Sequence, residues 1–420
     1  MPPSRRPRRR ESEAADSRGR ETRRNWARSA AIALGAAAIL WLTLANTVGG
    51  IVHATQAGRV LGWSPFDARL KAGAALASFS RVRDQAGLIP VGDLAEQALR
   101  RDPTNVDAVR TLALVRYLQN RPREAASLFR YSDRLSRRDL GTRLWLIEDR
   151  VRADDVAGAL GHFDLALRTS PQAAEILMPV LVSAVQQPHI ARRFRALLNA
   201  NPPWRQTFFE PLVHSSRSRA MAVYLMSGHL DAGNAADRFI AKAAFSRFLR
   251  ENDPAQAWAL YDSIRGVGAA ARAAAIRDGG FDQAGDLPPF DWMVTADSDL
   301  GGVRQGRPDA ANNVALFLFS EGQRAGDVAR QLLRLPPGRY VFRARSGSLP
   351  QSAPAQPSVR LECTAGTALF ARTFRELGAG QAFTVPAGGC AAQWLIIAGG
   401  AIEADQSMPW IDDIAIARAE

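Results

Sequence analysis

Cysteine, histidine and lysine are all scarce in this sequence of 420 residues. It contains two cysteines, Cys363 and Cys390, and two lysines, Lys71 and Lys242. So few cysteines exclude a disulfide-stapled scaffold and a cysteine-rich zinc module. The five histidines, at positions 53, 162, 189, 214 and 229, lack the spacing of metal ligands. We therefore predict no metal site.

The sequence also lacks the motifs of common catalytic families. It contains no HExxH, no GxSxG, no phosphate-binding loop and no dinucleotide fingerprint. Asp412 and Asp413 are adjacent on an expected strand, so their side chains should point to opposite faces. They cannot form the facing carboxylate pair of a glycosidase. We expect no catalytic residue and no bound cofactor, and we interpret the chain as a non-enzyme.

The net charge of +13 is distributed unevenly. Residues 1–25 carry nine arginines and four acids, whereas residues 281–420 carry twelve arginines and fifteen acids. The middle of the chain is therefore strongly basic. Such a run is usually a solvated face, but an arginine-lined groove would also suit an acidic partner or an acidic polysaccharide.

An uncharged segment follows the basic N-terminal tail. Residues 1–25 contain no Leu, Ile, Val or aromatic residue, which predicts a disordered tail. From Ser29 to Gly58 there is no charged residue, and a helix over 27–48 would be about 33 Å long, enough to cross a bilayer core. A cleaved signal peptide is the alternative. Because the apolar run exceeds the usual 7–15 residues of such a peptide, we predict an uncleaved transmembrane signal anchor over 26–50.

The arginines before this span predict its orientation. Basic residues stay on the cytoplasmic side, so the N-terminus should lie in the cytoplasm and the bulk of the chain outside it. The expected location is the bacterial inner membrane, single-pass, with the bulk in the periplasm. The basic tail could instead bind nucleic acid. Because the orientation of the membrane span explains these arginines more simply, we expect no nucleic-acid partner.

Residues 65–280 are rich in Ala, Leu and Arg, with apolar residues three and four apart, which predicts an all-helical region. A period of 34 residues relates Ala125 to Ala159 and Phe129 to Phe163. A repeat of this length indicates stacked helical units.

Small and aromatic residues at these positions resemble the tetratricopeptide repeat. The resemblance implies a solenoid that binds protein partners. It also implies a repeat core, formed by Ala125, Phe129, Ala159, Phe163, Ala166 and Pro171. The sequence departs from the family at Arg137, which replaces the proline, and at Val109 and Arg143, which replace the tryptophan of the first helix.

After about residue 285 the pattern becomes all-β, with short apolar or alternating runs separated by turn residues. The expected strands cover 290–294, 313–321, 328–335, 339–345, 357–363, 368–376, 381–385, 392–400 and 410–419. About nine strands in 140 residues predict an antiparallel β-sandwich or jelly roll over 285–420.

Three segments of this region resemble a carbohydrate-binding-module-type jelly roll. They are Phe290-Asp291-Trp292, the hairpin at 335–340 and the closing run at 410–414. The resemblance implies that Trp292, Trp394 and Trp410 are the candidates to stack on sugar rings, although a core position is the better interpretation of each because each lies among alternating strand residues. It also allows a structural calcium at Asp412 or Asp413, for which an ordinary solvent-facing role is the better interpretation.

The two cysteines both lie in this β region. Outside the cytoplasm, neighbouring thiols tend to oxidise. We therefore expect a Cys363–Cys390 disulfide, with two buried free thiols as the alternative.

Taken together, these features predict a membrane-anchored chain with an α-helical solenoid and a C-terminal β-sandwich. This combination resembles accessory proteins of bacterial exopolysaccharide assembly and export. It implies a non-enzymatic scaffold whose repeats bind proteins and whose sandwich holds glycan. Two alternatives stay open: a glycan-active enzyme with catalytic acids in the β-domain loops, and a general periplasmic protein–protein adaptor.

Overall fold

The computed structural model describes residues 67–283, 285–307, 313–321, 324–401 and 408–419. The chain divides into two compact units, one up to Ser170 and one from Pro171 onward. The expected tail at 1–25 and signal anchor at 26–50 lie outside the described residues. Among the described residues, no helix combines the length and the apolar character needed to cross a membrane.

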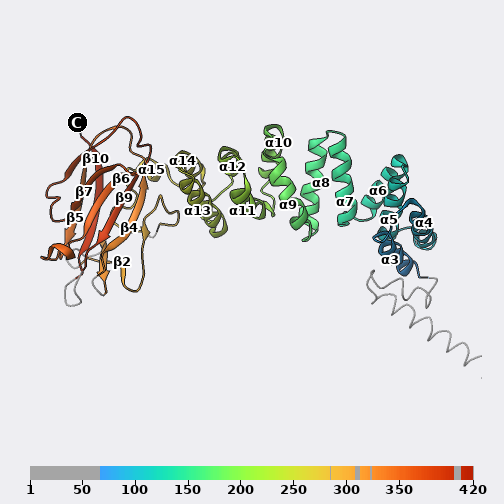
Figure 1. Cartoon of the computed structure of the whole chain (residues 1–420), viewed down its shortest axis with the longest axis horizontal. Coiled ribbons are helices and arrows are strands. Elements are labelled where there is room, and N and C mark those ends of the chain that lie inside the picture. Colours follow the sequence, from blue (N-terminus) through green and yellow to red (C-terminus); the bar gives the residue numbers. More distant parts are fainter. Residues whose placement is uncertain (1–66, 284, 308–312, 322–323, 402–407, 420) are drawn as a thin grey trace, which may run out of the picture. The chain divides into compact units, whose positions relative to one another are not determined.

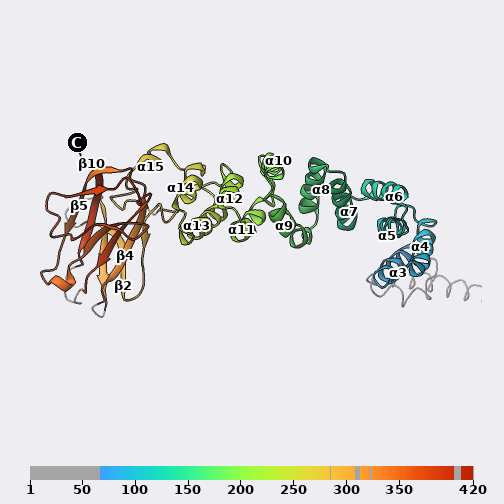
Figure 2. The same ribbon diagram turned by 45° about the horizontal axis from the view of Figure 1, so that its top comes forward.

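The described part of the first unit, residues 67–170, contains three helix pairs, which are labelled in Figure 1. The pairs are α3 (Ala68–Phe79) with α4 (Gln85–Leu99), α5 (Val106–Leu118) with α6 (Pro122–Leu135), and α7 (Leu140–Arg152) with α8 (Val156–Thr169). Figures 1 and 2 show α7 and α8 lying side by side. The helical prediction for this part of the chain is confirmed.

The 34-residue period appears in the backbone as well as in the side chains. Asn105 caps the N-terminus of α5 by accepting from the Ala108 amide at 3.0 Å, and Asp139, 34 residues later, caps α7 in the same way. The turns inside the two pairs also match, because Asn120 and Asp154 both have positive φ, at 60° and 54°. Each turn uses a residue type that tolerates this conformation.

The core of the first unit lies between successive pairs. Phe129 of α6 is fully buried and stacks on Trp145 of α7, with ring centroids 4.1 Å apart and an interplanar angle of 14°. Ala125 and Ala113 are also fully buried beside them, and their small side chains allow the helices to approach. Each pair therefore buries its apolar side against the next pair.

The position of Pro171 corrects one detail of the expected repeat core. The proline is exposed, so it does not pack in the core. Helix α8 ends at Thr169 and Ser170 is its C-terminal cap in an extended conformation. The proline follows directly, and it disfavours helical backbone in the residue before it. Its contribution is to end the helix.

The second unit begins with further helices. They are α9 (Ala173–Ala184), α10 (Pro188–Leu198), α11 (Arg205–Ser215), α12 (Arg219–Met226), α13 (Ala235–Arg250), α14 (Pro254–Ser263) and the short α15 (Ala269–Ala273). A buried ion pair holds α11 to α13, since Arg205 donates to both carboxylate oxygens of Asp237 at 2.8 Å. Both side chains are more than nine-tenths buried.

The second unit ends in a sandwich of two antiparallel sheets, as the sequence predicts. One sheet has the order β1-β4-β9-β6-β7 and the other β2-β3-β10-β5-β8. The strands are β1 (Met293–Val294), β2 (Leu300–Gly306), β3 (Val314–Ser320), β4 (Gly326–Leu333), β5 (Gly338–Gly347), β6 (Ser358–Cys363), β7 (Ala368–Thr373), β8 (Gln381–Val385), β9 (Gln393–Gly399) and β10 (Trp410–Arg418). Nine of them overlap the expected strands, whereas β2 was missed.

A disulfide lies in the sandwich core. Cys363 at the end of β6 and Cys390 before β9 are bonded, with their Cα atoms 5.0 Å apart. Both residues are buried among the apolar side chains that fill the space between the sheets. Closing a loop of this length is worth roughly 3.5 kcal/mol in the chain-entropy treatment.

An aromatic cluster joins the last helices to the sandwich within the second unit. The fully buried Phe290, just before β1, stacks on Tyr261 of α14 with ring centroids 4.2 Å apart. It also contacts Trp258 at 4.4 Å and Phe245 of α13 at 4.8 Å, both edge-on. The segment that opens the β domain is therefore part of the helical core.

Replacing Phe129 by alanine tests the core between repeats. The change removes a fully buried ring and its stack on Trp145, so we expect a loss of about 3–5 kcal/mol in the free energy of unfolding. Chemical denaturation followed by circular dichroism measures it. Replacing Phe239, which is 66% exposed on α13, is the matched control and should cost less than about 0.5 kcal/mol. Equal losses for the two variants would show that Phe129 is not a core residue.

Candidate functional site

Among the described residues, two histidines are buried or half-buried, and neither is arranged for catalysis. His162 Nδ1 lies 3.1 Å from the guanidinium of Arg143, and burial, reinforced by that positive charge, lowers the pKa of His162. Burial also lowers the pKa of His229 to about 4, with Arg195 and Arg205 adding to the effect. In the described part of the chain, no group of three or more His, Cys, Asp or Glu residues could hold a metal ion.

Two of the three tryptophans expected to bind sugar are core residues. Trp292 is 4% exposed, packs on Phe281 with ring centroids 5.0 Å apart, and donates from Nε1 to the Asp278 carbonyl at 2.9 Å. Trp410 is 7% exposed, and Gly347 lies against its ring so closely that a Cβ there would come within 2.3 Å. Neither ring has a face open to a ligand, so a stacking role is wrong for both.

The paired aspartates of β10 have separate roles. Asp412 is fully buried and accepts from Arg307 at 2.7 Å and from Asn313 at 2.9 Å. The same guanidinium lies 4.4 Å from the centre of the Trp410 ring. Asp413 has a positive φ of 49° and is exposed. An arginine thus occupies the position at Asp412 that a cation would need, and the carboxylate serves the fold.

Trp394 is the one candidate whose ring reaches the surface. It is half-buried on β9, and it faces away from the core because its neighbour Leu395 faces into it. Arg330 of β4 lies over the ring, with the guanidinium carbon 5.2 Å from the ring centre. Trp394 also pairs across the sheet with Glu362 of β6. An aromatic ring beside charged side chains is a surface on which a sugar can stack and form hydrogen bonds.

The charged residues of this outer sheet face are held in fixed positions. Arg360 of β6 makes two parallel hydrogen bonds to the carboxylate of Asp327 on β4, both of 2.7 Å. Glu362 lies 3.7 Å from the same guanidinium. These hydrogen bonds to Asp327 are the main reason why the pKa of the Arg360 guanidinium is raised. Together with Trp394 and Arg330, these three residues form what we call the outer sheet face.

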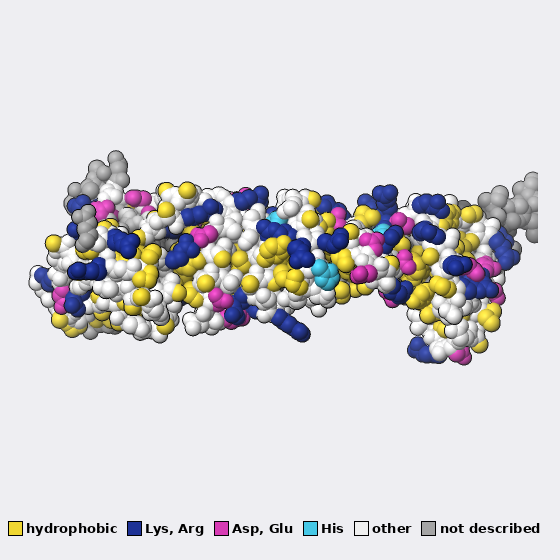
Figure 3. All heavy atoms as spheres, turned by 90° about the horizontal axis from the view of Figure 1, so that it is seen from above, with side chains coloured by type: hydrophobic (Ala, Val, Ile, Leu, Met, Phe, Trp, Pro, Cys, Tyr) yellow, Lys and Arg dark blue, Asp and Glu magenta, His cyan; other side chains and the backbone are white. Residues whose placement is uncertain are grey.

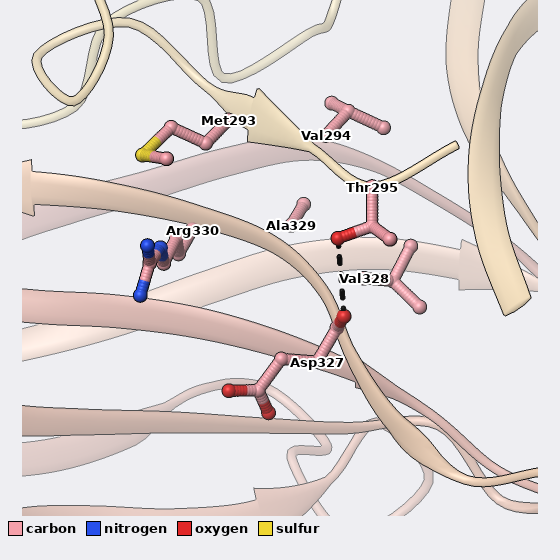
Figure 4. A pocket seen from close by; sticks show the side chains of 7 residues that line it. All are labelled: Met293, Val294, Thr295, Asp327, Val328, Ala329 and Arg330. Atoms are coloured by element: carbon pink, nitrogen blue, oxygen red, sulfur yellow. Dashed lines mark hydrogen bonds between the residues drawn. The ribbon is translucent and has the colours of Figure 1, made fainter. Parts of the chain in front are cut away.

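A small pocket borders the outer sheet face at the edge between β1 and β4 (Figure 4). Its volume is about 200 Å³, and it is lined by Met293, Val294, Thr295, Asp327, Val328, Ala329 and Arg330. Thr295 Oγ1 donates to the Asp327 carbonyl at 3.3 Å. The pocket is small for a ligand site, since such sites usually enclose at least about 300 Å³. It extends the outer sheet face and is not a site in itself.

A second candidate surface lies on the first helices of the repeats. Leu114, Tyr117 and Leu118 follow one stripe of α5, and Leu118 is 45% exposed. On the neighbouring α7, Val151 is 60% exposed, and the guanidinium carbon of Arg152 lies 5.2 Å from the centre of the Tyr117 ring, so α5 and α7 contact each other here. We call it the α5–α7 apolar face. Figure 3 shows one side of the molecule, on which hydrophobic side chains are exposed among basic ones over the helices.

The expected core positions of the repeats are buried. Ala125, Phe129 and Ala166 are fully buried, and Ala159 and Phe163 are at most 7% exposed. Trp145, which completes the stack on Phe129, was not among the predicted core residues. Arg143, at the position of the missing tryptophan, is 1% exposed and forms an ion pair with Asp133. An ion pair between the buried Arg143 and the half-buried Asp133 therefore stands at this position of the repeat.

No family model matches the chain, and no curated protein matches it. Among solved structures, the APC/C hetero-tetramer Cut9-Hcn1 matches 49% of this chain and 41% of its own, with 15% identity and a TM-score of 0.27. PilF of Pseudomonas aeruginosa matches 53% of this chain and 87% of its own, with 14% identity and a TM-score of 0.26. The chain spans less than half the length of the first of these, and neither match bears on function.

Removing Arg307 tests the structural role of Asp412. The variant Arg307→Met leaves a buried carboxylate without its counter-ion, so we expect a loss of about 3–5 kcal/mol in stability. The double variant Arg307→Met/Asp412→Asn removes both charges and should recover a large part of that loss. Urea denaturation of the three proteins measures it. A double variant less stable than Arg307→Met would contradict the assignment.

Proposed function

We propose that this chain is a non-enzymatic scaffold of the bacterial cell envelope, in which the helical repeats bind a protein partner and the β-sandwich binds glycan. The observation that carries the proposal is the α5–α7 apolar face. Leu118 of α5 and Val151 of α7 are exposed there on adjacent first helices, which also carry the Tyr117 ring and Arg152. Apolar residues flanked by Arg and Tyr are typical of protein interfaces.

Location and biological role belong to the proposal too. The uncharged run from Ser29 to Gly58, preceded by nine arginines, supports a membrane anchor with the N-terminus in the cytoplasm. The Cys363–Cys390 disulfide supports an oxidising compartment for the bulk of the chain. In that compartment, the resemblance of the sequence to accessory proteins favours a role in exopolysaccharide assembly or export.

The partner surface can be tested in the cell. A photo-crosslinking amino acid at Leu118 should capture a defined protein, and Leu118→Asp/Val151→Asp should weaken binding of that protein at least tenfold, since a charge at an apolar contact costs about 2 kcal/mol or more. Binding of the purified proteins measures the effect. Ile89→Asp is the matched control, because Ile89 is 59% exposed on α4, the second helix of its pair. If both variants bind equally well, the α5–α7 apolar face is not the interface.

Glycan binding rests on the outer sheet face. Titration of the full chain with cellohexaose, a neutral oligosaccharide, should show binding that Trp394→Ala weakens about 10- to 100-fold, because a single anchoring aromatic dominates such contacts. Trp394→Phe keeps a ring and should retain most of the affinity. Unchanged binding in Trp394→Ala, or no binding in the parent protein, would leave the sandwich without a glycan role at this face.

A further inference from the structure

The outer surface of α6 carries a row of arginines. Helix α6 buries Ala125, Phe129 and Ser132 against the rest of the repeat and turns its opposite side outward. The exposed basic residues of that side, together with two that follow the helix, are Arg123, Arg130, Arg134, Arg137 and Arg138. We call them the α6 arginine row.

These arginines differ from the others around them in having no acidic partner. Every arginine of α5, α7 and α8 forms an ion pair with a carboxylate; they are Arg110, Arg116, Arg143, Arg150, Arg152 and Arg168. Within the described residues, no carboxylate pairs with a member of the α6 arginine row. Arg134 of the row makes a cation–π contact, with its guanidinium carbon 5.9 Å from the centre of the Tyr131 ring.

The acids of α6 are directed elsewhere. Glu124 lies 3.5 Å from both Arg116 and Arg121, and Asp133 pairs with the buried Arg143. Both carboxylates therefore pair with arginines that do not belong to the α6 arginine row. The positive charge of the row is left uncompensated, which is unfavourable by itself because like charges repel.

The spacing of the row fits a long, thin ligand. Positions 123, 130 and 134 fall within about 20° of one line along the helix, at intervals of about 10 Å and 6 Å. Arg137 and Arg138 continue the row beyond the C-terminus of α6. A chain molecule with negative charges along one edge can meet these guanidinium groups in succession. Arginine suits carboxylates in particular, because its planar fork can donate two parallel hydrogen bonds.

We propose that the α6 arginine row binds an acidic, carboxylate-bearing polysaccharide. A membrane surface is less well matched, because the apolar side of α6 is buried in the repeat and cannot insert into lipid. The choice of polysaccharide over nucleic acid rests on the proposed function in one respect, namely the extracytoplasmic location that the disulfide supports. This site is separate from both the α5–α7 apolar face and the outer sheet face.

The experiment uses the full chain in detergent and polygalacturonate as the probe. Binding should weaken steeply as salt rises, because the contacts are exposed charges. The variant Arg123→Gln/Arg130→Gln/Arg134→Gln should bind about tenfold more weakly and show a flatter salt dependence. Arg100→Gln/Arg150→Gln/Arg168→Gln removes the same charge from arginines that already have carboxylate partners, and its affinity should stay within about twofold of the parent.

Several outcomes would overturn the proposal. One is no binding of polygalacturonate by the parent protein, and another is equal weakening by both triple variants, which would indicate a diffuse charge effect. Neutral dextran bound as tightly as polygalacturonate would exclude charge recognition. Tighter binding to duplex DNA or to phosphatidylglycerol vesicles would assign the row to another polyanion. None of these results affects the protein partner, which is tested separately at Leu118 and Val151.

Discussion

The first unit depends on the contact between the second helix of one repeat and the first helix of the next. A single helix pair has one apolar side and cannot bury it alone. Here Phe129 of α6 lies flat on Trp145 of α7, and small residues around the stack let the helices approach. Tyr117 of α5 also packs against this stack, whereas Leu118 of α5 and Val151 of α7 stay exposed and can contact a partner.

Arginine is used in two ways on this scaffold. Where it is buried it has a carboxylate, as with Arg143 and Asp133 in the first unit, Arg205 and Asp237 on α11 and α13, and Arg307 and Asp412 in the sandwich. Leaving such a charge unpaired would cost several kcal/mol. Where it is exposed, its partner is optional, and the α6 arginine row lacks one. The distribution of acids, more than the number of arginines, therefore distinguishes structural from binding positions.

Much of the architecture follows from sequence patterns. The 34-residue period located the helix pairs because small and aromatic residues at fixed spacing determine how helices pack. Alternation located nine strands, whereas β2 was missed because its LGGVRQG sequence has three glycines and little alternation. Gly301 and Gly302 are required there, since a Cβ at either would come within 2.6 to 2.8 Å of a packed side chain. At β2, the close packing of neighbouring side chains therefore outweighs the low strand propensity of glycine.

The candidate sites could be predicted from the sequence less completely than the fold. Burial of Trp292 and Trp410, exposure of Trp394 and the pairing of Asp412 with Arg307 all depend on contacts between residues up to 105 positions apart. Composition could report a basic middle region, but only the structure separates paired arginines from unpaired ones. Sequence periodicity identifies the side of a helix that packs in the core. It says less about which side chains or ligands contact the opposite, exposed side.

The burial of Phe290 among Tyr261, Trp258 and Phe245 bears on how this protein can be divided. A cut near residue 285, where the composition changes from helical to β, would separate Phe290 from the three aromatic rings that surround it. The helical fragment would then have a cavity in its core, and the β fragment would expose the apolar side chain of Phe290 to water. Gene fusions or limited digests that preserve both halves should therefore avoid this junction. The β-sandwich is joined through Phe290 to the core of the helices that precede it.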